Sequence, residues 1–461
     1  MSYEAYIASH RNDFESRFFE VLRLPSISAI EAHRPDVKRT AEWFCNLFTA
    51  IGLHAELLDV PLHQGGHPLV FAEYVPKTAT ENTPTLLFYG HYDVQPPDPL
   101  ELWNSPPFEP TVREGNVYAR GATDDKGQFL THVFAVESIL RSQESFPCKI
   151  KFIVEGEEES IGSQTLAHFL HTAEGKQKLS CDCIVVSDTS QFAPDQPTIT
   201  YGLRGILACE LFLTGPNRDL HSGTFGGSVF NPAIALTKIL SQFVDASGVI
   251  QIPHFYEDVI PLTDRERSQF AALPFDDAGF YAKIGLTDGF GERGYSTNER
   301  RWARPTFDIN GITAGYQGEG TKTIVPSKAS AKFTCRLVPN QDPKKIATAV
   351  RSFIGTLIPP GIVWEFAVQH GASGMRLDLD QSRFVEPMVQ ALEQTFGKKP
   401  VFTREGGSIP IVAEFGQVLG ADVLLVGWGQ DDDALHSPNE KFSLASFHRG
   451  ILASARFLTK I

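Results

Sequence analysis

The 461-residue sequence has no long apolar run, no basic tract and no internal repeat. No stretch approaches the ~20 apolar residues that a membrane-spanning helix needs, so a membrane protein is not expected. The 41 Lys and Arg residues against 55 Asp and Glu give a formal charge of −14. This balance disfavours nucleic acid or an anionic membrane surface as a partner. The composition is otherwise that of an ordinary globular protein.

Cysteine is scarce: there are six, and none lies in a Cys-x-x-Cys pair. This excludes a compact disulfide framework. Cys181-Asp-Cys183 could form a thiolate metal site, but both cysteines fit better as small buried residues at the start of a strand. Unpaired thiols and the polar start Met1-Ser-Tyr-Glu-Ala predict a cytoplasmic location. A Gly-x-Gly-x-x-Gly at a strand–helix turn is also missing, which argues against a dinucleotide-dependent oxidoreductase.

The length predicts two or three domains, and the order of the expected elements divides the chain into two. Short apolar strands, at 85–90, 149–154 and 183–186, alternate with helices, which is typical of an α/β sheet with helices on both faces. The middle of the chain instead follows the order strand–helix–strand–strand–helix–strand, as in a ferredoxin-like sandwich, with a loop-rich stretch at 250–300. The predicted organisation is a first domain at 1–203 and 381–461 with a second domain, 204–380, inserted in it.

Five clusters of possible metal ligands recur along the chain. They are His91-Tyr-Asp93, Asp124-Asp125, Glu157-Glu158-Glu159, Asp188 and His436-Ser-Pro-Asn-Glu440. Each alone has an ordinary explanation, such as a helix N-cap for the paired aspartates or a solvated turn for the three glutamates. Most of them close a predicted strand, however, and open α/β sheets form their sites at that edge. Together they could hold two divalent metals about 3.5–4 Å apart, which predicts a two-metal hydrolase.

The chemistry of such a hydrolase assigns different tasks to neighbouring acids. One glutamate has to bind a metal while another takes a proton from water, and the run of three could supply both. Of the two adjacent aspartates, one is expected to ligate and the other to be structural. Asp93 could accept a hydrogen bond from the second ring nitrogen of His91 and so fix its tautomer.

The middle domain contains a second group of polar residues: His221, Thr323, Arg336 and His370-Gly371. His221 could donate to an oxyanion, and Arg336 could bind a carboxylate. Spacing alone favours the plainer interpretation, a loop histidine and a surface arginine.

Taken together, these motifs resemble the M20 metallopeptidases, most of all the carnosinase and cytosolic non-specific dipeptidase branch. The resemblance runs from about residue 20 to the end of the chain. The segments that carry it are Gly-His91-Tyr-Asp93-Val-Gln-Pro, Arg-Gly-Ala-Thr-Asp124-Asp125-Lys-Gly, Glu-Gly-Glu-Glu158-Glu159, Ser-Asp188, Asp-Leu-His221-Ser-Gly, Arg336-Leu-Val-Pro and Arg-Glu-Gly-Gly-Ser408-Ile-Pro. The fold it implies is α/β, with a doubly wound catalytic domain, a co-catalytic metal site and an inserted ferredoxin-like α+β lid and dimerisation domain.

The activity implied by the resemblance is hydrolysis of the amide bond of dipeptides or short peptides with a free C-terminal carboxylate. The alternative is an N-acyl or N-carbamoyl amino acid deacylase of the same family. A non-catalytic binding protein on this fold is disfavoured, because the chain contains a residue that matches each of the family's five metal ligands and its general base. The cofactors implied are two divalent metal ions per subunit, Zn²⁺ or Mn²⁺, and nitrogen and oxygen ligands do not decide between them.

The resemblance also implies a role for each matching residue. One metal takes His91 and Asp188, the other takes Glu159 and His436, and Asp124 bridges them, followed by a cis peptide to Asp125. The catalytic residues are Glu158 as general base, Asp93 as the partner of His91, and His221, which reaches across a homodimer to the partner site. The substrate's carboxylate end is expected to contact Thr323, Arg336 and Ser408.

Two departures from the family pattern leave points open. One residue is extra before Gly162-Ser163, so the base and the ligand could be Glu157 and Glu158 instead of Glu158 and Glu159. Alignment from the Glu155-Gly156 side favours Glu158 as the base and Glu159 as the ligand. The stretch from His370 to Arg376 lacks the aromatic and proline residues common there, which leaves the substrate preference open.

Overall fold

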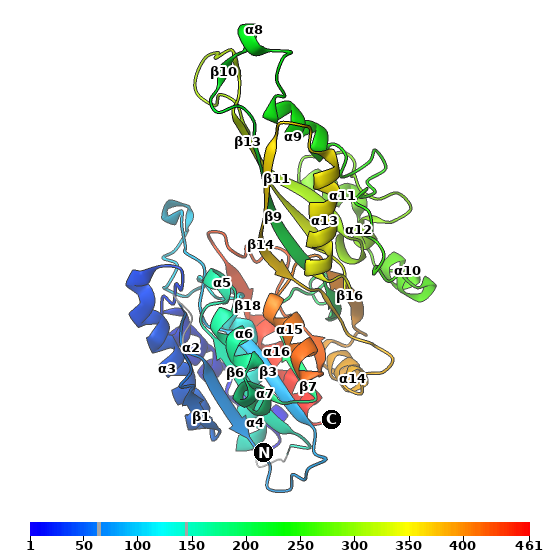
Figure 1. Ribbon diagram of the computed structural model, residues 1–461. Coiled ribbons are helices and arrows are strands. Elements are labelled where there is room, and N and C mark those ends of the chain that lie inside the picture. Colours follow the sequence, from blue (N-terminus) through cyan, green and yellow to red (C-terminus); the bar gives the residue numbers. More distant parts are fainter. Residues whose placement is uncertain (62–65, 143–145) are drawn as a thin grey trace. The chain divides into compact units, whose positions relative to one another are not determined.

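The computed structural model describes residues 1–61, 66–142 and 146–461, and these form two units (Figure 1). The first unit contains Met1–Tyr201, Leu377–Thr403 and Glu414–Ile461, and the second contains Gly202–Arg376 and Arg404–Ala413. The predicted boundaries at 203/204 and 380/381 lie within a few residues of these. The prediction was wrong for 404–413, which it gave to the first domain. That segment belongs to the second unit because Arg404 forms a buried ion pair with Glu266 there.

The large sheet is mixed, and its parallel centre belongs to the first unit. Its strand order is β1-β2-β6-β3-β7-β17-β8-β15, and β16 also pairs with β8. The parallel centre consists of β6 (Lys149–Glu155), β3 (Thr85–His91), β7 (Cys183–Val186) and β17 (Asp422–Leu425). The flanking strands pair antiparallel: β1 (His54–Leu57), β2 (Val70–Tyr74), β8 (Thr198–Leu203) and β15 (Met375–Arg376). The last strand, β16, spans Val401–Glu405. The four parallel strands place their carboxyl ends at one edge of the sheet.

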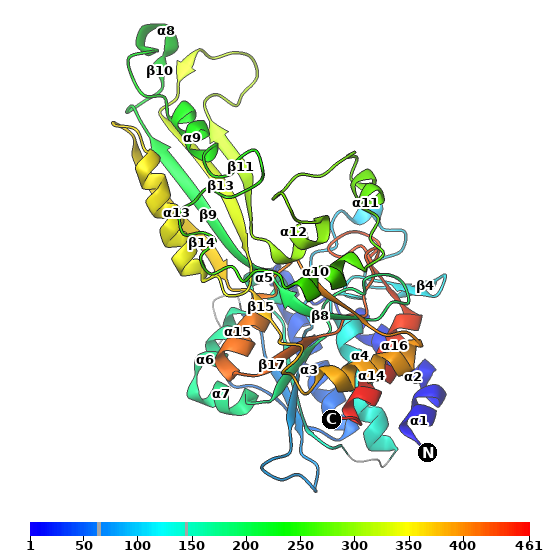
Figure 2. The same ribbon diagram turned by 90° about the vertical axis from the view of Figure 1, so that its right-hand side faces the viewer.

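Helices lie on both sides of this sheet, as Figures 1 and 2 show from two directions. One side has α6 (Gln164–His171), α7 (Ala173–Leu179) and α15 (Pro410–Leu419), and the short α5 (Glu158–Ile161) precedes them in the chain. The other side has α1 (Tyr3–Ser9), α2 (Arg11–Leu22), α3 (Arg34–Ile51), α4 (Lys126–Arg141), α14 (Val385–Phe396) and α16 (Leu444–Leu458). Smaller strands β4 (Thr111–Arg113), β5 (Asn116–Tyr118) and β18 (Lys441–Ser443) form a separate sheet.

The core of the first unit forms where apolar helix faces meet the sheet. Helix α3 buries Phe44 and Phe48 on one face, because apolar residues recur along it at helical spacing. Their rings meet Phe129 of α4 and Phe152 of β6. Helix α4 is buried along nearly its whole length, which suits a helix enclosed between the sheet and other helices. This packing fixes the start of α4, where the paired aspartates lie.

The second unit has the predicted element order. It runs β9 (Gly205–Thr214), α9 (Pro232–Leu240), β11 (Thr306–Ala314), β13 (Lys328–Leu337), α13 (Pro343–Leu357) and β14 (Val363–Ala372). The sheet is antiparallel in the order β11-β13-β9-β14. Alternate residues of β9 and β13 are buried in a core shared with α9 and α13, so the opposite face of the sheet is open.

Part of the stretch predicted as loop-rich is helical. It contains α10 (Asp264–Ala271), α11 (Asp277–Lys283) and α12 (Thr297–Ala303). Capping boxes start two of these helices, Thr263 with Glu266 and Ser296 with Glu299. Reciprocal side-chain bonds satisfy the first backbone N–H groups of a helix and stabilise it even without a strong apolar face. In the described part of the chain, no helix has the length and apolar character needed to cross a bilayer.

Candidate metal centre

The predicted ligands gather at the carboxyl edge of the parallel strands in the first unit. His91 ends β3 and pairs in register with Glu155, the last residue of β6. Asp188 follows β7 by two residues, and Glu158 and Glu159 follow β6 in α5. The chain has no other edge where four strand ends coincide in this way among the strands described. The topology therefore brings together side chains that are far apart in sequence.

Two groups of three ligand atoms share Asp124. His91, Asp124 and Asp188 form one group, and Asp124, Glu159 and His436 form the other, each with its ligand atoms within 4.8 Å of one another. Asp124 Oδ1 lies 3.1 Å from His91 Nε2, while Oδ2 lies 3.0 Å from His436 Nε2. Each carboxylate oxygen thus faces a different imidazole, as a bridging ligand does.

The peptide bond between Asp124 and Asp125 is cis, as the resemblance implies. Asp125 occupies the N-cap position of α4, but its side chain makes no capping hydrogen bond. Burial raises the pKa of Asp125 well above its ordinary value, and the charge of Asp188 adds to the shift. Asp125 therefore occupies the position of a helix cap, but its side chain does not act as one.

Asp93 contacts one residue of each ligand group, His91 of the first and Glu159 of the second. His91 Nδ1 lies 3.2 Å from the Asp93 backbone carbonyl and 3.4 Å from Asp93 Oδ1, which leaves Nε2 directed at Asp124. Asp93 Oδ2 accepts hydrogen bonds from the Ser28 hydroxyl at 2.6 Å and the Glu159 backbone N–H at 3.0 Å. A backbone carbonyl or carboxylate acceptor on the second ring nitrogen fixes the tautomer of a metal-binding histidine.

The three adjacent glutamates point to different partners. Glu157 is fully buried and accepts hydrogen bonds from the backbone N–H and hydroxyl of Thr165 and from the backbone N–H of His67. Glu159 lies 3.4 Å from His436 Nε2 and accepts a hydrogen bond from Gln95. Glu158 interacts electrostatically with His91 and Asp188. Glu159 therefore lies at the centre, while Glu157 anchors the loop through partners outside the two ligand groups.

The charges of this group fit divalent cations. Burial raises the pKa of Glu158 well above its ordinary value, and burial with the neighbouring Asp124 raises the pKa of Glu159. Hydrogen bonds to Asp124 and Glu159 raise the pKa of His436 to about 10. Buried carboxylates outnumber the imidazoles, so their charged forms need further positive charge nearby. Imidazole nitrogen and carboxylate oxygen are ligands that zinc and manganese accept.

Sequence reasoning missed the role of Glu440, although it lies in the same motif as His436. The buried Glu440 carboxylate accepts hydrogen bonds from Arg120 Nη1 at 2.8 Å and from the backbone N–H groups of Gly121, Thr123 and Asp124 at 2.9, 3.0 and 3.2 Å. It therefore ties the loop of the shared aspartate to the loop of His436. The only sign of this role in the sequence was the position of Glu440 in the motif His436-Ser-Pro-Asn-Glu440.

The predicted residues of the second unit form two pairs. His221 lies in β10 (Leu220–His221), which pairs with β12 (Ile324–Val325), and the Ser222 backbone N–H donates to the Thr323 carbonyl at 3.1 Å. Arg336 Nη1 donates to Ser408 Oγ at 3.2 Å. The first pair lies beyond the Lys328 end of β13, and Arg336 lies near the other end. Eight residues of strand separate these two positions by roughly 26 Å, so Thr323 is not brought together with Arg336 and Ser408.

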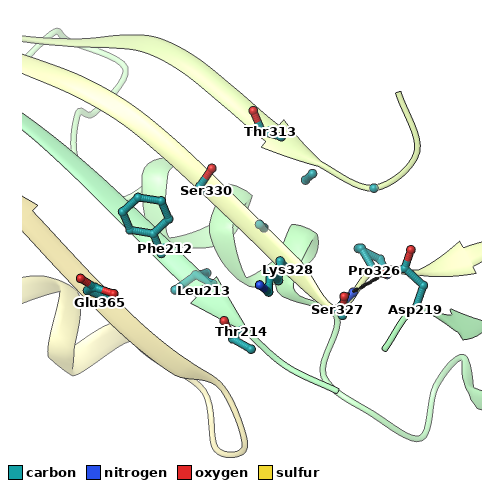
Figure 3. Close-up of a pocket in the computed structure, with 13 residues that line it drawn as sticks. Phe212, Leu213, Thr214, Asp219, Thr313, Pro326, Ser327, Lys328, Ser330 and Glu365 are labelled. Carbon is teal, nitrogen blue, oxygen red and sulfur yellow. Dashed lines mark hydrogen bonds between the residues drawn. The ribbon is translucent and has the colours of Figure 1, made fainter. Parts of the chain in front are cut away.

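A pocket of about 490 Å³ lies on the open face of the second unit's sheet (Figure 3). Phe212, Ser330 and Glu365 line it from three neighbouring strands. Asp219 borders it and accepts hydrogen bonds from the backbone and hydroxyl of Ser327 at 2.9 Å. None of the predicted site residues lines this pocket, so the chemistry is to be sought at the first unit's ligand groups.

Comparisons with known proteins agree with this geometry. The profile of peptidase family M20/M25/M40 matches residues 87–460. The Cys-Gly metallodipeptidase dug1 of Schizosaccharomyces pombe is 32% identical over 96% of this chain and 94% of its own. The human Beta-Ala-His dipeptidase is 28% identical over 99% and 91%. The chain belongs to the M20 peptidase family.

Solved structures lead to the same conclusion. Dug1p of Saccharomyces cerevisiae has a TM-score of 0.79 at 30% identity, over 100% of this chain and 99% of that one. The M20 metallo-carboxypeptidase Sso-CP2 of Sulfolobus solfataricus has a TM-score of 0.82 at 32% identity, over 97% and 98%. An amidase of the hydantoinase/carbamoylase family from Burkholderia multivorans is only 11% identical at a TM-score of 0.57 and shares the fold alone. The chain is a peptide-bond hydrolase of metallopeptidase type that uses divalent metal.

Proposed function

We propose that this enzyme hydrolyses the amide bond of dipeptides and that each site residue has a defined role in the reaction. The observation that carries the proposal is the pair of ligand groups that share Asp124. Relatives that match this chain over nearly their whole length are named as dipeptidases. They are the Cys-Gly metallodipeptidases and the Beta-Ala-His dipeptidase. The deacylase alternative has no relative at comparable identity among these.

Two divalent cations, zinc or manganese, complete the proposed site. One is assigned to His91 and Asp188 and the other to Glu159 and His436, with Asp124 shared. When bound, such a pair acts as a Lewis acid on the scissile carbonyl and lowers the pKa of the attacking water.

The side chains of the protein handle the proton and the charges. Glu158 takes a proton from the attacking water and passes it to the leaving amine. Burial raises the pKa of Glu158 above its ordinary value, which strengthens the carboxylate as a proton acceptor. His221 donates a hydrogen bond to the oxygen that becomes negative as the carbonyl is attacked. Arg336 and Ser408 bind the substrate's C-terminal carboxylate, with the guanidinium supplying the charge.

The second unit, ferredoxin-like in its strand order, is proposed as a lid and dimerisation domain. His221 with Thr323 and Arg336 with Ser408 lie at opposite ends of long strands, while an extended dipeptide spans at most ~7 Å. The two pairs can therefore meet one substrate only if they come from different copies of the chain, which supports a homodimer with His221 and Thr323 in the partner's site. An interface is available at β11, an edge strand with Ile309 and Ile312 exposed.

Replacing Ile312 with lysine is expected to convert the dimer into a monomer. A charge on an exposed edge strand opposes pairing with a second copy. Sedimentation velocity at micromolar concentration measures the change, and Val363→Lys on the opposite edge strand β14 is the matched control, since Val363 is 71% exposed. A monomeric wild-type protein, or an Ile312→Lys dimer as stable as wild type, would contradict the proposed interface.

A cytoplasmic location is also proposed. All six cysteines are free thiols, four of them buried, as expected of a protein kept in a reducing compartment. Fractionation of the source cells tests this, and activity confined to an extracellular or membrane fraction would contradict it.

The proposed activity is tested with a panel of dipeptides, C-terminal dipeptide amides, N-acetyl amino acids and N-carbamoyl amino acids. The metal-free protein is reloaded with manganese or with zinc before each assay. Metal-dependent cleavage of dipeptides is the expected result, and it also identifies the metal that supports the higher turnover. Cleavage of N-acyl substrates alone would move the enzyme to the deacylase alternative, which needs the same ligands but a different pocket.

A further inference from the structure

The carboxylate-binding pair Arg336–Ser408 has a second guanidinium beside it. Burial lowers the pKa of Arg204, at the start of the second unit, to about 10; the like charge of Arg336 adds to this shift and the charge of Asp308 opposes it. In the described chain neither guanidinium has a carboxylate within 4.0 Å. Two part-buried guanidiniums without an ion-pair partner attract an anionic group.

Arg204 also holds the segment that carries Ser408. Its Nε donates to the Gly406 carbonyl at 3.1 Å, and its Nη1 donates to the Arg304 carbonyl at 3.3 Å. The first bond fixes the backbone two residues before Ser408, and the second attaches that backbone to the end of α12. A planar guanidinium with several donors can make both bonds at once.

Gly406 fits tightly into this arrangement. A Cβ atom at this position would lie 2.7 Å from Arg204 Nη2 and 2.7 Å from the Arg301 carbonyl. The segment 406–408 is therefore held between the Arg204 side chain and the backbone of α12. Its position relative to Arg336 depends on that contact.

We infer that Arg204 is a positioning and specificity-determining residue that makes Arg336 and Ser408 selective for a carboxylate over a carboxamide. Its bonds keep Ser408 within reach of Arg336, and its charge favours the anionic form of the substrate's C-terminus. The inference rests on the proposed function, because it concerns the same substrate carboxylate.

The test compares a dipeptide with its C-terminal amide in wild type, Arg204→Gln and Arg204→Lys. For Arg204→Gln we expect KM for the free acid to rise about tenfold, the size expected from a lost charge-assisted contact, with kcat within about twofold of wild type. The amide is expected to be unaffected, so the acid-to-amide ratio of kcat/KM falls about tenfold. Arg204→Lys keeps the charge but lacks the several donors of a guanidinium. Its acid-to-amide ratio should lie between those of wild type and Arg204→Gln.

Arg351→Gln is the matched control, because it removes one positive charge from the same unit and its guanidinium packs on Trp364. Gly406→Ala is the second variant and covers the case in which Arg204→Gln fails to fold. It should displace Ser408 and lower the acid-to-amide ratio in the same direction. Thermal unfolding shows that each variant is folded.

The outcomes separate this inference from the proposed function. A wild-type enzyme that cleaves no dipeptide would overturn the proposed function itself. If wild type prefers the free acid but Arg204→Gln and Gly406→Ala keep that preference, the function stands and the role of Arg204 is wrong. Equal losses on acid and amide would reduce Arg204 to a structural residue and also overturn the inference.

Discussion

Glu158→Gln lowers kcat by about 10²–10⁴-fold and leaves the metal content unchanged, which is the largest effect expected from a residue that binds no metal. Glutamine keeps the shape of the side chain but cannot take a proton from water or return it to the leaving amine. The two ligand groups contain Glu159 but not Glu158, so both should still bind their cations. Steady-state kinetics on a dipeptide, with metal measured by mass spectrometry on the same sample, checks both parts.

Glu157→Gln is the matched comparison, since it makes the same chemical change one residue earlier. Glu157 accepts three hydrogen bonds from Thr165 and His67, so an amide there places donors against donors. We expect a loss of about 1–3 kcal/mol in the free energy of unfolding, with kcat of the folded protein within a few-fold of wild type. The reverse pattern, with turnover lost in Glu157→Gln and kept in Glu158→Gln, would show that Glu157 is the base.

Asp124→Ala is expected to reduce the bound metal from two ions per chain to fewer than one. Its two oxygens face His91 and His436 separately, so each cation loses a ligand and the two lose their bridge. A cation's Lewis acidity is worth several kcal/mol, so kcat/KM should fall by at least about 10³-fold. Metal titration by calorimetry and turnover at saturating metal measure the two effects. Retention of two ions per chain would exclude the bridging role.

Glu440→Gln gives a graded comparison because it keeps every ligand and alters only the group that holds the Asp124 backbone. Supporting residues of this kind change metal affinity by about 10–100-fold. We therefore expect weaker metal binding and turnover that recovers at high metal concentration, unlike Asp124→Ala. Asp432→Asn is the control on the same loop, since Asp432 is exposed and bonds only Lys441 among the described residues. Turnover that does not recover with added metal would contradict a supporting role for Glu440.

The grouping of the ligands was accessible from the sequence because parallel strands end at one edge of a sheet. His91, Asp188 and Glu159 each follow an apolar strand closely, and the register of β3, β6 and β7 then sets them side by side. The order of elements in the second unit was accessible for a similar reason, since strand and helix patterns alternate clearly there. Short helices in the stretch 250–300 escaped because caps, and not apolar periodicity, define them.

Other features depend on contacts between distant segments, which leave no local pattern. Glu440 bonds backbone groups more than 300 residues earlier, and Arg404 joins the second unit through Glu266. Neither contact has a spacing or periodicity that could be read from the chain. The antiparallel flanks of the large sheet likewise follow from pairing choices that short apolar strands do not specify.

The sequence by itself determined the chemistry available to this protein. It supplied the two imidazoles and the excess of carboxylates, placed them after strands, and carried the motifs of the M20 family. Only the tertiary structure decided which partner each of several adjacent acids faces. Glu157 turns to Thr165 while Glu159 faces His436, because adjacent side chains on a turn diverge and the partners that fix them come from other segments. The same holds for the second unit, where only the fold shows that a ten-residue strand separates His221 from Arg336.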